Sequence, residues 1–507
     1  MSEDGEISTL DAPRRTDPIG LIPLVLTNVR QALVGLIAAY FGIQSADLGF
    51  GFTLLAMLAV VALVAGASAL SWWRTTYTTG PEDIRVESGI ISRQARSVPY
   101  ERIQDVSKEQ PLLARLFGLV QLRFETGAGG KDDLSLAYVS DAEGERLRKL
   151  VRDRREVSAA QTAEETDDEP EEQPLFAMTS GRIALFGFFE FSLVVFGVLA
   201  AAAQQFDFLL PEGFFDPSYW QQKFGDGYGT LANAGRWTQL FGAVLGVMGL
   251  ALVGVATGFA KTFAREYGFL LTRSERGFRR RRGLFTRTDV VMPVHRVQAA
   301  IVGTGLIRKR WGWHGLKFVS LAQDAGSSNH DVAPFAQMDE IERIADVTAL
   351  ELPTADTPWQ RPSPWRWLIG GVLWSAVASY VAAMAYLWGR PTLALSIAAV
   401  GIPLIVLRQW LNWQQYRHAI DSRQLYARSG VIKRNVMIAP RQRIQSVEIM
   451  RGPLGKLAGY VDLVFGLPGG RLRFIGVPTA AAQSIRDQVV ETIAATDYSR
   501  SAVGQVS

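Results

Sequence analysis

The chain has 507 residues, of which 48% are hydrophobic and 20% charged, and it contains no cysteine. The lack of cysteine excludes a disulfide framework, a cysteine-ligated zinc cluster and a thiol nucleophile. The net charge of +4, from 53 basic and 49 acidic side chains, does not predict nucleic acid as a partner. The apolar fraction indicates long apolar runs set between polar segments, which is typical of a membrane protein.

Six apolar runs occur as three pairs, and each run approaches the roughly 20 residues needed to cross a bilayer. They predict three transmembrane hairpins, at 18–73, 181–260 (with an external loop) and 365–412. The remaining non-globular segments are a polar tail at 1–17, an acidic linker at 156–180, a Pro-rich linker at 351–364 and a tail at 497–507. The first tail lacks the apolar core of a cleavable signal peptide.

Two ionisable residues, Arg30 and Glu190, lie inside the predicted spans. A charge within the bilayer is costly, so each is a candidate functional residue. Glu190 is expected to face the interior of the helix bundle and to bond either Arg30 or a polar backbone site. For Arg30 the alternative is that Pro18 to Arg30 lies along the interface and the span begins later.

Three segments, at 74–155, 261–350 and 413–496, change to short β-branched and aromatic runs separated by Gly, Pro and Asp. This pattern is typical of strands and turns. Ile84–Glu87 and Leu122–Glu125 alternate apolar with polar residues, as half-buried antiparallel strands do. Each segment ends in an amphipathic helix, expected to begin near Asp141, Gln337 and Pro478. The prediction is one β-domain with a closing helix, repeated three times.

The three segments share a motif of Pro, Arg three residues later, an aliphatic residue and Gln. Its members are Pro99, Arg102, Gln104; Pro293, Arg296, Gln298; and Pro440, Arg443, Gln445. A Gly lies ten residues before each Pro and another nineteen residues after it. Matching offsets in three places indicate an internal repeat. The later Gly residues, Gly118, Gly312 and Gly459, are expected to adopt a turn with positive φ.

The order of hairpin, Tyr at the membrane exit, Gly and repeated motif resembles that of the bacterial pleckstrin-homology (PH) domain membrane proteins of the YdbS/YdbT-like family. The resemblance is to the longer form with three such domains, and it covers nearly the whole chain outside the tails and linkers. It implies a PH-like fold, a strongly bent antiparallel sheet capped by a C-terminal helix. It also implies an association with envelope stress or resistance to antimicrobial peptides, and no particular chemistry.

The second copy departs from the pattern, because Ala299-Ala300 replaces Asp105-Val106 and a basic run is added. The added residues are Arg279, Arg280, Arg281 and Arg282, followed by Arg287. In a domain tethered to the membrane such a run attracts anionic lipid at about 1 kcal/mol per residue near the surface. A solvated hairpin tip is the alternative, and the sequence does not separate the two.

The Arg and Gln of the repeated motif are candidates for ligand contact, because guanidinium groups suit phosphate head groups. The structural interpretation is favoured, since Ile103, Val297 and Ile444 alternate with them as core residues. In that interpretation Arg and Gln tie one strand to a neighbouring turn.

No catalytic, cofactor-binding or metal site is predicted. The four histidines are scattered without ligand spacing, and neither a P-loop nor a nucleophile elbow occurs. The chain is therefore predicted to be an α+β membrane scaffold without enzymatic activity, whose PH-like domains self-assemble and bind lipid, peptide or protein. Expected partners are membrane lipid and either further copies or a smaller related PH-domain membrane protein. The alternative is a transporter or channel component that uses Arg30 and Glu190.

Basic residues near the span ends gather on the side that carries the termini and the β-domains. By the positive-inside rule this side is cytoplasmic. The predicted location is the bacterial inner membrane, crossed several times, with both termini and all three domains in the cytoplasm.

Overall fold

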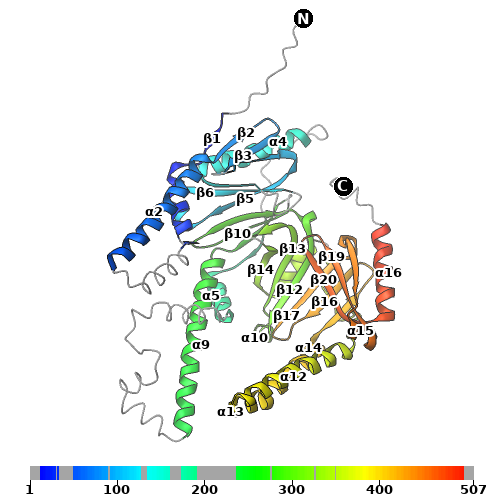
Figure 1. Cartoon of the computed structure of the whole chain (residues 1–507). Helices are drawn as coiled ribbons and strands as arrows, with labels where there is room; N and C mark the ends of the chain where they lie inside the picture. Colours follow the sequence, from blue (N-terminus) through cyan, green and yellow to red (C-terminus); the bar gives the residue numbers. More distant parts are fainter. Residues whose placement is uncertain are drawn as a thin grey trace.

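The computed structural model describes residues 12–29, 31–32, 50–89, 92–126, 134–159, 173–190, 236–274, 277–324, 327–348 and 350–495. Arg30, most of the acidic linker, the external loop of the second hairpin and the C-terminal tail lie outside the described residues. Within them, three β-domains follow one another along the chain, with long helices projecting from them (Figure 1).

Each β-domain has a first sheet, a corner, a second sheet interrupted by a short helix, and a C-terminal helix. Domain 1 consists of β2 (Thr76–Thr79), β3 (Asp83–Ser88), β4 (Gln94–Pro99), β5 (Ile103–Gln110), α3 (Leu112–Leu116), β6 (Leu119–Thr126), β7 (Leu134–Ser140) and α4 (Asp141–Ala159). Domain 2 consists of β9 (Leu270–Ser274), β10 (Gly277–Arg282), β11 (Arg287–Met292), β12 (Val297–Gly305), α10 (Leu306–Arg310), β13 (His314–Asp324), β14 (Ser327–Ala336) and α11 (Met338–Asp346). Domain 3 consists of β15 (Arg417–Ile420), β16 (Gln424–Ser429), β17 (Lys433–Pro440), β18 (Ser446–Met450), α15 (Pro453–Ala458), β19 (Tyr460–Leu467), β20 (Gly470–Pro478) and α16 (Thr479–Ala495). The predicted β-domains and their closing helices are confirmed.

The repeated motif forms the corner between the two sheets of each domain. Pro99, Pro293 and Pro440 adopt nearly the same backbone angles, with φ of −59°, −61° and −62°. Proline favours this φ because of its ring, and each begins a single 3-10 turn that ends at the motif Arg. The aliphatic residue that follows is buried in all three copies. The motif is thus a structural signature of the corner.

The two glycines that flank each motif have positive φ, as predicted for the later one. That later Gly has φ of 66°, 73° and 69° in the three domains. The earlier Gly, in the turn before the third strand, has φ of 118°, 112° and 91°, and a Cβ there would lie within about 2 Å of a backbone oxygen. Only glycine fits this turn without strain.

Neighbouring domains are joined by backbone pairing into continuous sheets. β5 of domain 1 pairs antiparallel with β11 of domain 2, which gives a seven-stranded sheet in the order β7-β6-β5-β11-β10-β9-β8. β12 of domain 2 pairs in the same way with β17 of domain 3, in a six-stranded sheet. The apolar cores follow this sharing, because Ala299 and Val319 of domain 2 belong to the core of domain 3.

A short segment before each predicted hairpin pairs with the first strand after it. β1 (Arg14–Arg15) pairs with β2, and β8 (Gln173–Ala177) pairs with β9. Before the third hairpin, Gln360 forms an isolated bridge with His418 of β15. The sequence assigned these residues to a tail and two linkers, and the assignment missed their strand pairing. Each pairing holds the chain entering and the chain leaving a hairpin in one sheet.

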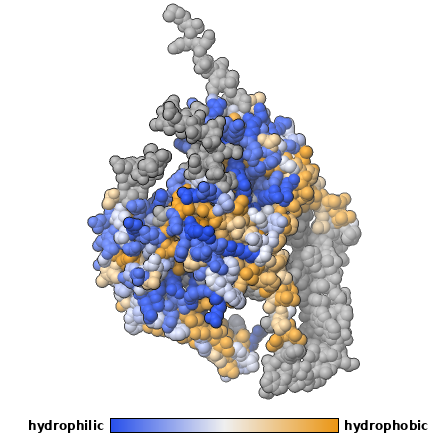
Figure 2. Space-filling model, turned by 180° about the vertical axis from the view of Figure 1, so that it is seen from behind, coloured by the Kyte–Doolittle hydropathy of each residue, from blue (hydrophilic) through white to orange (hydrophobic). Residues whose placement is uncertain are grey.

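Three helices among the described residues are long and apolar enough to cross a membrane, namely Leu54–Arg74 in α2 (Phe50–Arg74), α12 (Pro364–Leu387) and Pro391–Gln415. The last comprises α13 (Pro391–Ser396), a π turn (Ile397–Gly401) and α14 (Ile402–Gln415), and the π turn precedes Pro403, which has no N–H for the helical ladder. α12 and α14 pack against each other. Hydrophobic residues gather toward the lower and right-hand margins of the molecule, and hydrophilic ones over the β-domains (Figure 2).

The first and second predicted hairpins are described only in part. A helix at Pro18–Val29 packs against domain 1, where Gly20 meets Tyr138, and against α2, where Asn28 donates to Ser68. α5 (Ser180–Phe189) packs against the 31-residue α9 (Arg236–Glu266). The full set of six spans stays a prediction.

We expect acid to destabilise domain 3 through His418. This side chain is buried and stacks on Phe474 at 4.8 Å between ring centroids, and burial lowers its pKa from 6.5 to about 4. The unfolded chain takes up the proton first, so stability falls as pH drops from 6.5 toward 4, by about 2 kcal/mol at pH 5. His418→Phe removes this loss. Hydrogen exchange of β15 and β16 at pH 7 and pH 5 measures it, and an equal acid response in both proteins contradicts it.

Candidate interaction surfaces

The added arginine run forms most of strand β10, so its side chains alternate between two faces. The turn that follows it comprises residues 283–286 and contains no arginine. The interpretation of the run as a hairpin tip is therefore wrong. Contact of these arginines with anionic lipid stays a prediction.

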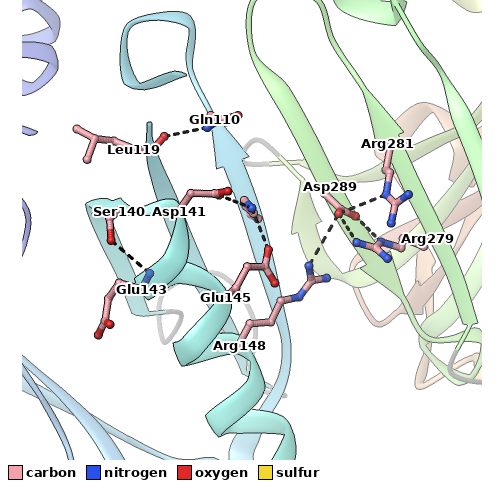
Figure 3. A network of polar contacts seen from close by, with 11 residues as sticks. Gln110, Leu119, Ser140, Asp141, Glu143, Glu145, Arg148, Arg279, Arg281 and Asp289 are labelled. Atoms are coloured by element: carbon pink, nitrogen blue, oxygen red, sulfur yellow. Dashed lines mark hydrogen bonds and ion pairs between the residues drawn. The ribbon is translucent and has the colours of Figure 1, made fainter. Parts of the chain in front are cut away.

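On one face of β10, Arg279 and Arg281 converge on Asp289 of the neighbouring β11 (Figure 3). Arg279 is bidentate, with its Nε 2.8 Å from Oδ1 and its Nη2 2.5 Å from Oδ2. Arg148, on the closing helix α4 of domain 1, reaches the same carboxylate at 3.8 Å. We call these four residues the junction cluster. It joins domains 1 and 2, and three guanidinium groups share one carboxylate.

The charge balance of the junction cluster keeps Asp289 ionised. Burial alone would raise the pKa of this carboxyl, but the hydrogen bond and charge of Arg279, with the charges of Arg148 and Arg281, outweigh burial and hold the pKa below its ordinary value. The cluster as a whole carries excess positive charge. Arg281 is partly exposed and Arg287 is exposed at the start of β11, so both reach solvent at this site.

On the other face of β10, arginines tie the strand to the end of helix α9. Arg282 Nη1 lies 3.1 Å from both oxygens of Glu266, the last residue of α9 and fully buried. The same nitrogen is 3.4 Å from Asp331 Oδ2, and the other oxygen of Asp331, Oδ1, pairs with Lys317 at 2.9 Å. Arg280 is buried and donates to the backbone oxygen of Asp331. These contacts hold domain 2 against the end of α9.

The arginines of the repeated motif lie in three different environments, and the structure does not bring them together. Arg296 is 2% exposed and meets the equally buried Glu125 of domain 1 at 3.7 Å. Gln298 is buried beside it and donates to the Arg296 backbone oxygen. Arg102 is exposed and Arg443 is half-buried. The side chain of Gln104 lies outside the described part of the chain, and Gln445 is exposed.

Glu190 has a different setting from the predicted one. It follows the last residue of α5, and its carboxylate lies 3.7 Å from Arg308 Nη2 on the short helix α10 of domain 2. The ring of the adjacent Phe189 lies 5.4 Å from that of Trp311. Glu190 is thus at a contact with a β-domain, and a pair with Arg30 lies outside the described residues.

The short helices α3, α10 and α15 expose large apolar side chains, a feature that the sequence interpretation missed. Leu116 is 71% exposed, Ile307 64% and Leu457 87%. Further exposed members are Leu112, Phe117, Leu306, Trp311 and Leu454. Basic residues accompany them in every copy, namely Arg115, Arg308, Lys309, Arg310 and Lys456. We call the exposed apolar residues the short-helix patches. The short helices recur at the same distance from the repeated motif, and this recurrence could have revealed the patches in the sequence.

Two of the short helices lie beside apolar helices or their ends. α15 contacts α12, and α10 contacts the end of α5 through Glu190. The turn between β10 and β11 is held against the end of α9, because Gly283 donates to the Tyr267 oxygen at 2.8 Å and Leu284 to the Ala264 oxygen at 2.9 Å. Phe285 at the tip of this turn is exposed. Apolar and basic side chains thus accumulate where domains 2 and 3 meet the apolar helices that precede them.

Comparison with known proteins identifies the repeated unit. The family described as "Bacterial PH domain" matches at residues 29–155, 227–351 and 368–492, which together form most of the chain. The chain belongs to the bacterial PH-domain family. Each match begins within or before an apolar segment; the first and third end in the closing helix of a PH domain, and the second ends five residues after α11. The three-domain, YdbS/YdbT-like membrane protein predicted from the motif is confirmed.

One curated relative of this PH-domain protein is "UPF0699 transmembrane protein YdbT" of Bacillus subtilis (strain 168), which is 23% identical over 326 residues. The aligned region covers 61% of this chain and 63% of the relative, so it spans less than two thirds of that protein. No solved structure gives a significant match. These findings establish a membrane protein with PH domains.

We expect Glu125→Leu to loosen the contact between PH domains 1 and 2. The substitution leaves the buried charge of Arg296 without its carboxylate, and breaking a buried pair in this way costs about 3–5 kcal/mol. Hydrogen exchange of β5 and β11, with thermal unfolding in detergent, measures the loss. The matched control is Glu125→Leu combined with Arg296→Met, which removes both charges and restores most of the stability. An equal loss in the double variant contradicts the assignment.

Proposed function

We propose that this chain is a non-enzymatic membrane scaffold whose three PH domains lie against the inner leaflet of the bacterial inner membrane and assemble there with other proteins. The observation that carries the proposal is the short-helix patch of each domain, in which exposed apolar side chains stand beside basic ones. This combination is typical of surfaces that enter the lipid headgroup region. The basic side chains favour the anionic cytoplasmic leaflet.

The hairpin layout follows from the strand pairing at the base of each apolar pair. β1 with β2, β8 with β9 and Gln360 with His418 place the two ends of each apolar segment in one sheet. A segment that leaves and returns to the same sheet must cross the bilayer an even number of times. We therefore propose six spans in three hairpins, with all three PH domains and both termini on the cytoplasmic side.

The proposed lipid contact combines burial of apolar side chains with attraction of basic side chains to anionic headgroups. Burying one large apolar side chain contributes about 1.5–3 kcal/mol, and each basic residue near an anionic surface adds about 1 kcal/mol. A separate candidate contact is the junction cluster, since its excess positive charge suits a phosphate group. Such a scaffold senses the composition of the leaflet, which fits a role in envelope stress or in resistance to antimicrobial peptides.

A transporter or channel has less support among the described residues. Glu190 pairs with Arg308 of a PH domain, which makes it a residue of the contact between helix and domain. Arg30, the other candidate for a polar pathway, falls outside the part of the chain that the structure describes. We therefore propose binding and assembly as the function.

We expect a probe at the short-helix patch of domain 3 to contact lipid. The cysteine-free chain accepts a single Leu457→Cys that can be labelled with a fluorophore. In lipid nanodiscs, quenchers attached near the headgroups should quench this probe, because Leu457 is expected to enter the interface. Val490→Cys, at an exposed position of the closing helix α16, is the control and should not respond. Equal quenching at both sites, or none at Leu457, contradicts the docking.

We expect charge reversal at Arg281 of the junction cluster and at the nearby Arg287 to reduce binding of anionic lipid. Arg281→Glu with Arg287→Glu removes two basic residues, which together contribute about 2 kcal/mol near an anionic surface. Native mass spectrometry of the detergent-solubilised protein counts retained anionic and zwitterionic lipids. Arg343→Glu with Arg486→Glu makes the same change in net charge at exposed sites on α11 and α16. A similar loss in both variants indicates a general charge effect and overturns the site.

A further inference from the structure

The two junctions between PH domains use the same strand register. In the first, Lys108 lies nine residues after Pro99 and faces Asp289, which lies four residues before Pro293. In the second, Val302 lies nine residues after Pro293 and faces Val436, four residues before Pro440. Both junctions therefore have the same construction. The strand that begins the second sheet of one domain pairs with the strand that ends the first sheet of the following domain.

The strands that correspond to the junction strands are sheet edges in the first sheet of domain 1 and in the second sheet of domain 3. β4 is an end strand of the first sheet of domain 1, and β18 is an end strand of the second sheet of domain 3. β4 corresponds to β11 in domain 2 and to β17 in domain 3. β18 corresponds to β5 in domain 1 and to β12 in domain 2. These four corresponding strands all pair across a junction. Among the described residues, no strand pairs with the free edge of β4 or of β18.

The side chains of these two edges are exposed where their equivalents are covered. Ile449 of β18 is 37% exposed, against 8% for Val302 at the same position of domain 2, and the next residue, Met450, is 56% exposed. β4 is exposed from Gln94 to Ser97. Arg102 is likewise exposed, whereas Arg296, the equivalent residue of domain 2, is buried against domain 1. Both ends thus present surface of the kind that the internal junctions bury.

We propose that β18 of one copy pairs antiparallel with β4 of a second copy, so that PH domain 3 of one chain joins PH domain 1 of the next. The internal register places Ile449 opposite Ala95, Met450 opposite Gln94 and Glu448 opposite Arg96. The last pair has opposite charges, which favours this pairing in an antiparallel sheet. The inference deepens the self-assembly of the proposed function and rests on it.

A second copy of this chain is the partner that fits both edges. Each edge carries a charge that discourages pairing with itself, since two β18 strands would bring Glu448 near Glu448 and two β4 strands Arg96 near Arg96. Only the mixed pairing is complementary. The contact is heterologous, so it generates a closed ring or an open row of domains. Pro453 limits the ladder, because it replaces Leu306, whose N–H donates to Ile432 at the internal junction.

Cross-linking between two tagged forms of the full chain tests the pairing. Ala95→Cys on one form and Ile449→Cys on the other are co-expressed and oxidised in native membranes, and the chain supplies no other cysteine. The expected product is a disulfide between the two forms. Val490→Cys in place of Ile449→Cys is the control, and it should give no such product. A cross-link that forms equally in both pairs, or in neither, overturns the proposal.

Charge variants distinguish strand pairing from mere proximity. Glu448→Arg should lower the cross-linked fraction several-fold, and Glu448→Arg combined with Arg96→Glu should restore it. Ile449→Lys should convert the oligomer to monomers in native mass spectrometry, because a lysine on an edge strand opposes pairing, while Val490→Lys should leave it unchanged. A wild-type chain that is strictly monomeric overturns the proposal, even where a smaller related protein binds it. Lipid quenching at Leu457 in the Ile449→Lys variant reports separately on the membrane function.

Discussion

The backbone pairing between successive PH domains is the constraint on which the rest of the structure depends. Strand N–H and C=O groups need partners, and here the third strand of one domain takes them from the fourth strand of the domain before it. This pairing makes one sheet of two domains. It brings Arg148 to Asp289 and Glu125 to Arg296, so buried and half-buried ion pairs lie where the backbone has already placed their elements. Domain boundaries in the sequence are therefore not boundaries of the sheets.

The same constraint explains why identical motif residues have different environments. Arg102, Arg296 and Arg443 follow the same corner, with the same proline geometry before it. Arg296 is buried because it lies against the sheet of domain 1, whereas Arg102 is exposed among the described residues. The motif specifies the corner, and the neighbouring domain specifies what surrounds the arginine.

Features with a local cause could be predicted from the sequence, whereas features that depend on distant partners could not. The repeated Pro and Gly residues constrain their own φ, so the turns that contain them could be predicted. The closing helices could be predicted from their amphipathic periodicity. The strand at Arg14–Arg15 is too short to show a period, and the strand pairing of Gln173–Ala177 depends on β9 about a hundred residues later. The junction strands pair through polar residues such as Lys108 and Asp289, which no apolar alternation reveals. Glu190 meets Arg308 because α5 packs on domain 2, a contact between segments far apart in the chain.

The long helix α9 and the PH domains are coupled through charged contacts at the end of the helix. Glu266 closes α9 and is held by Arg282 of β10, while the opposite face of β10 is held by Asp289 and, through it, by Arg148 of domain 1. A change in the tilt of α9 therefore acts on a strand that belongs to a sheet shared by two domains. Because sheet pairing resists shear between strands, such a change moves domains 1 and 2 together. In the proposed lipid-bound scaffold, the short-helix patches of both domains would then change their depth in the headgroup region together.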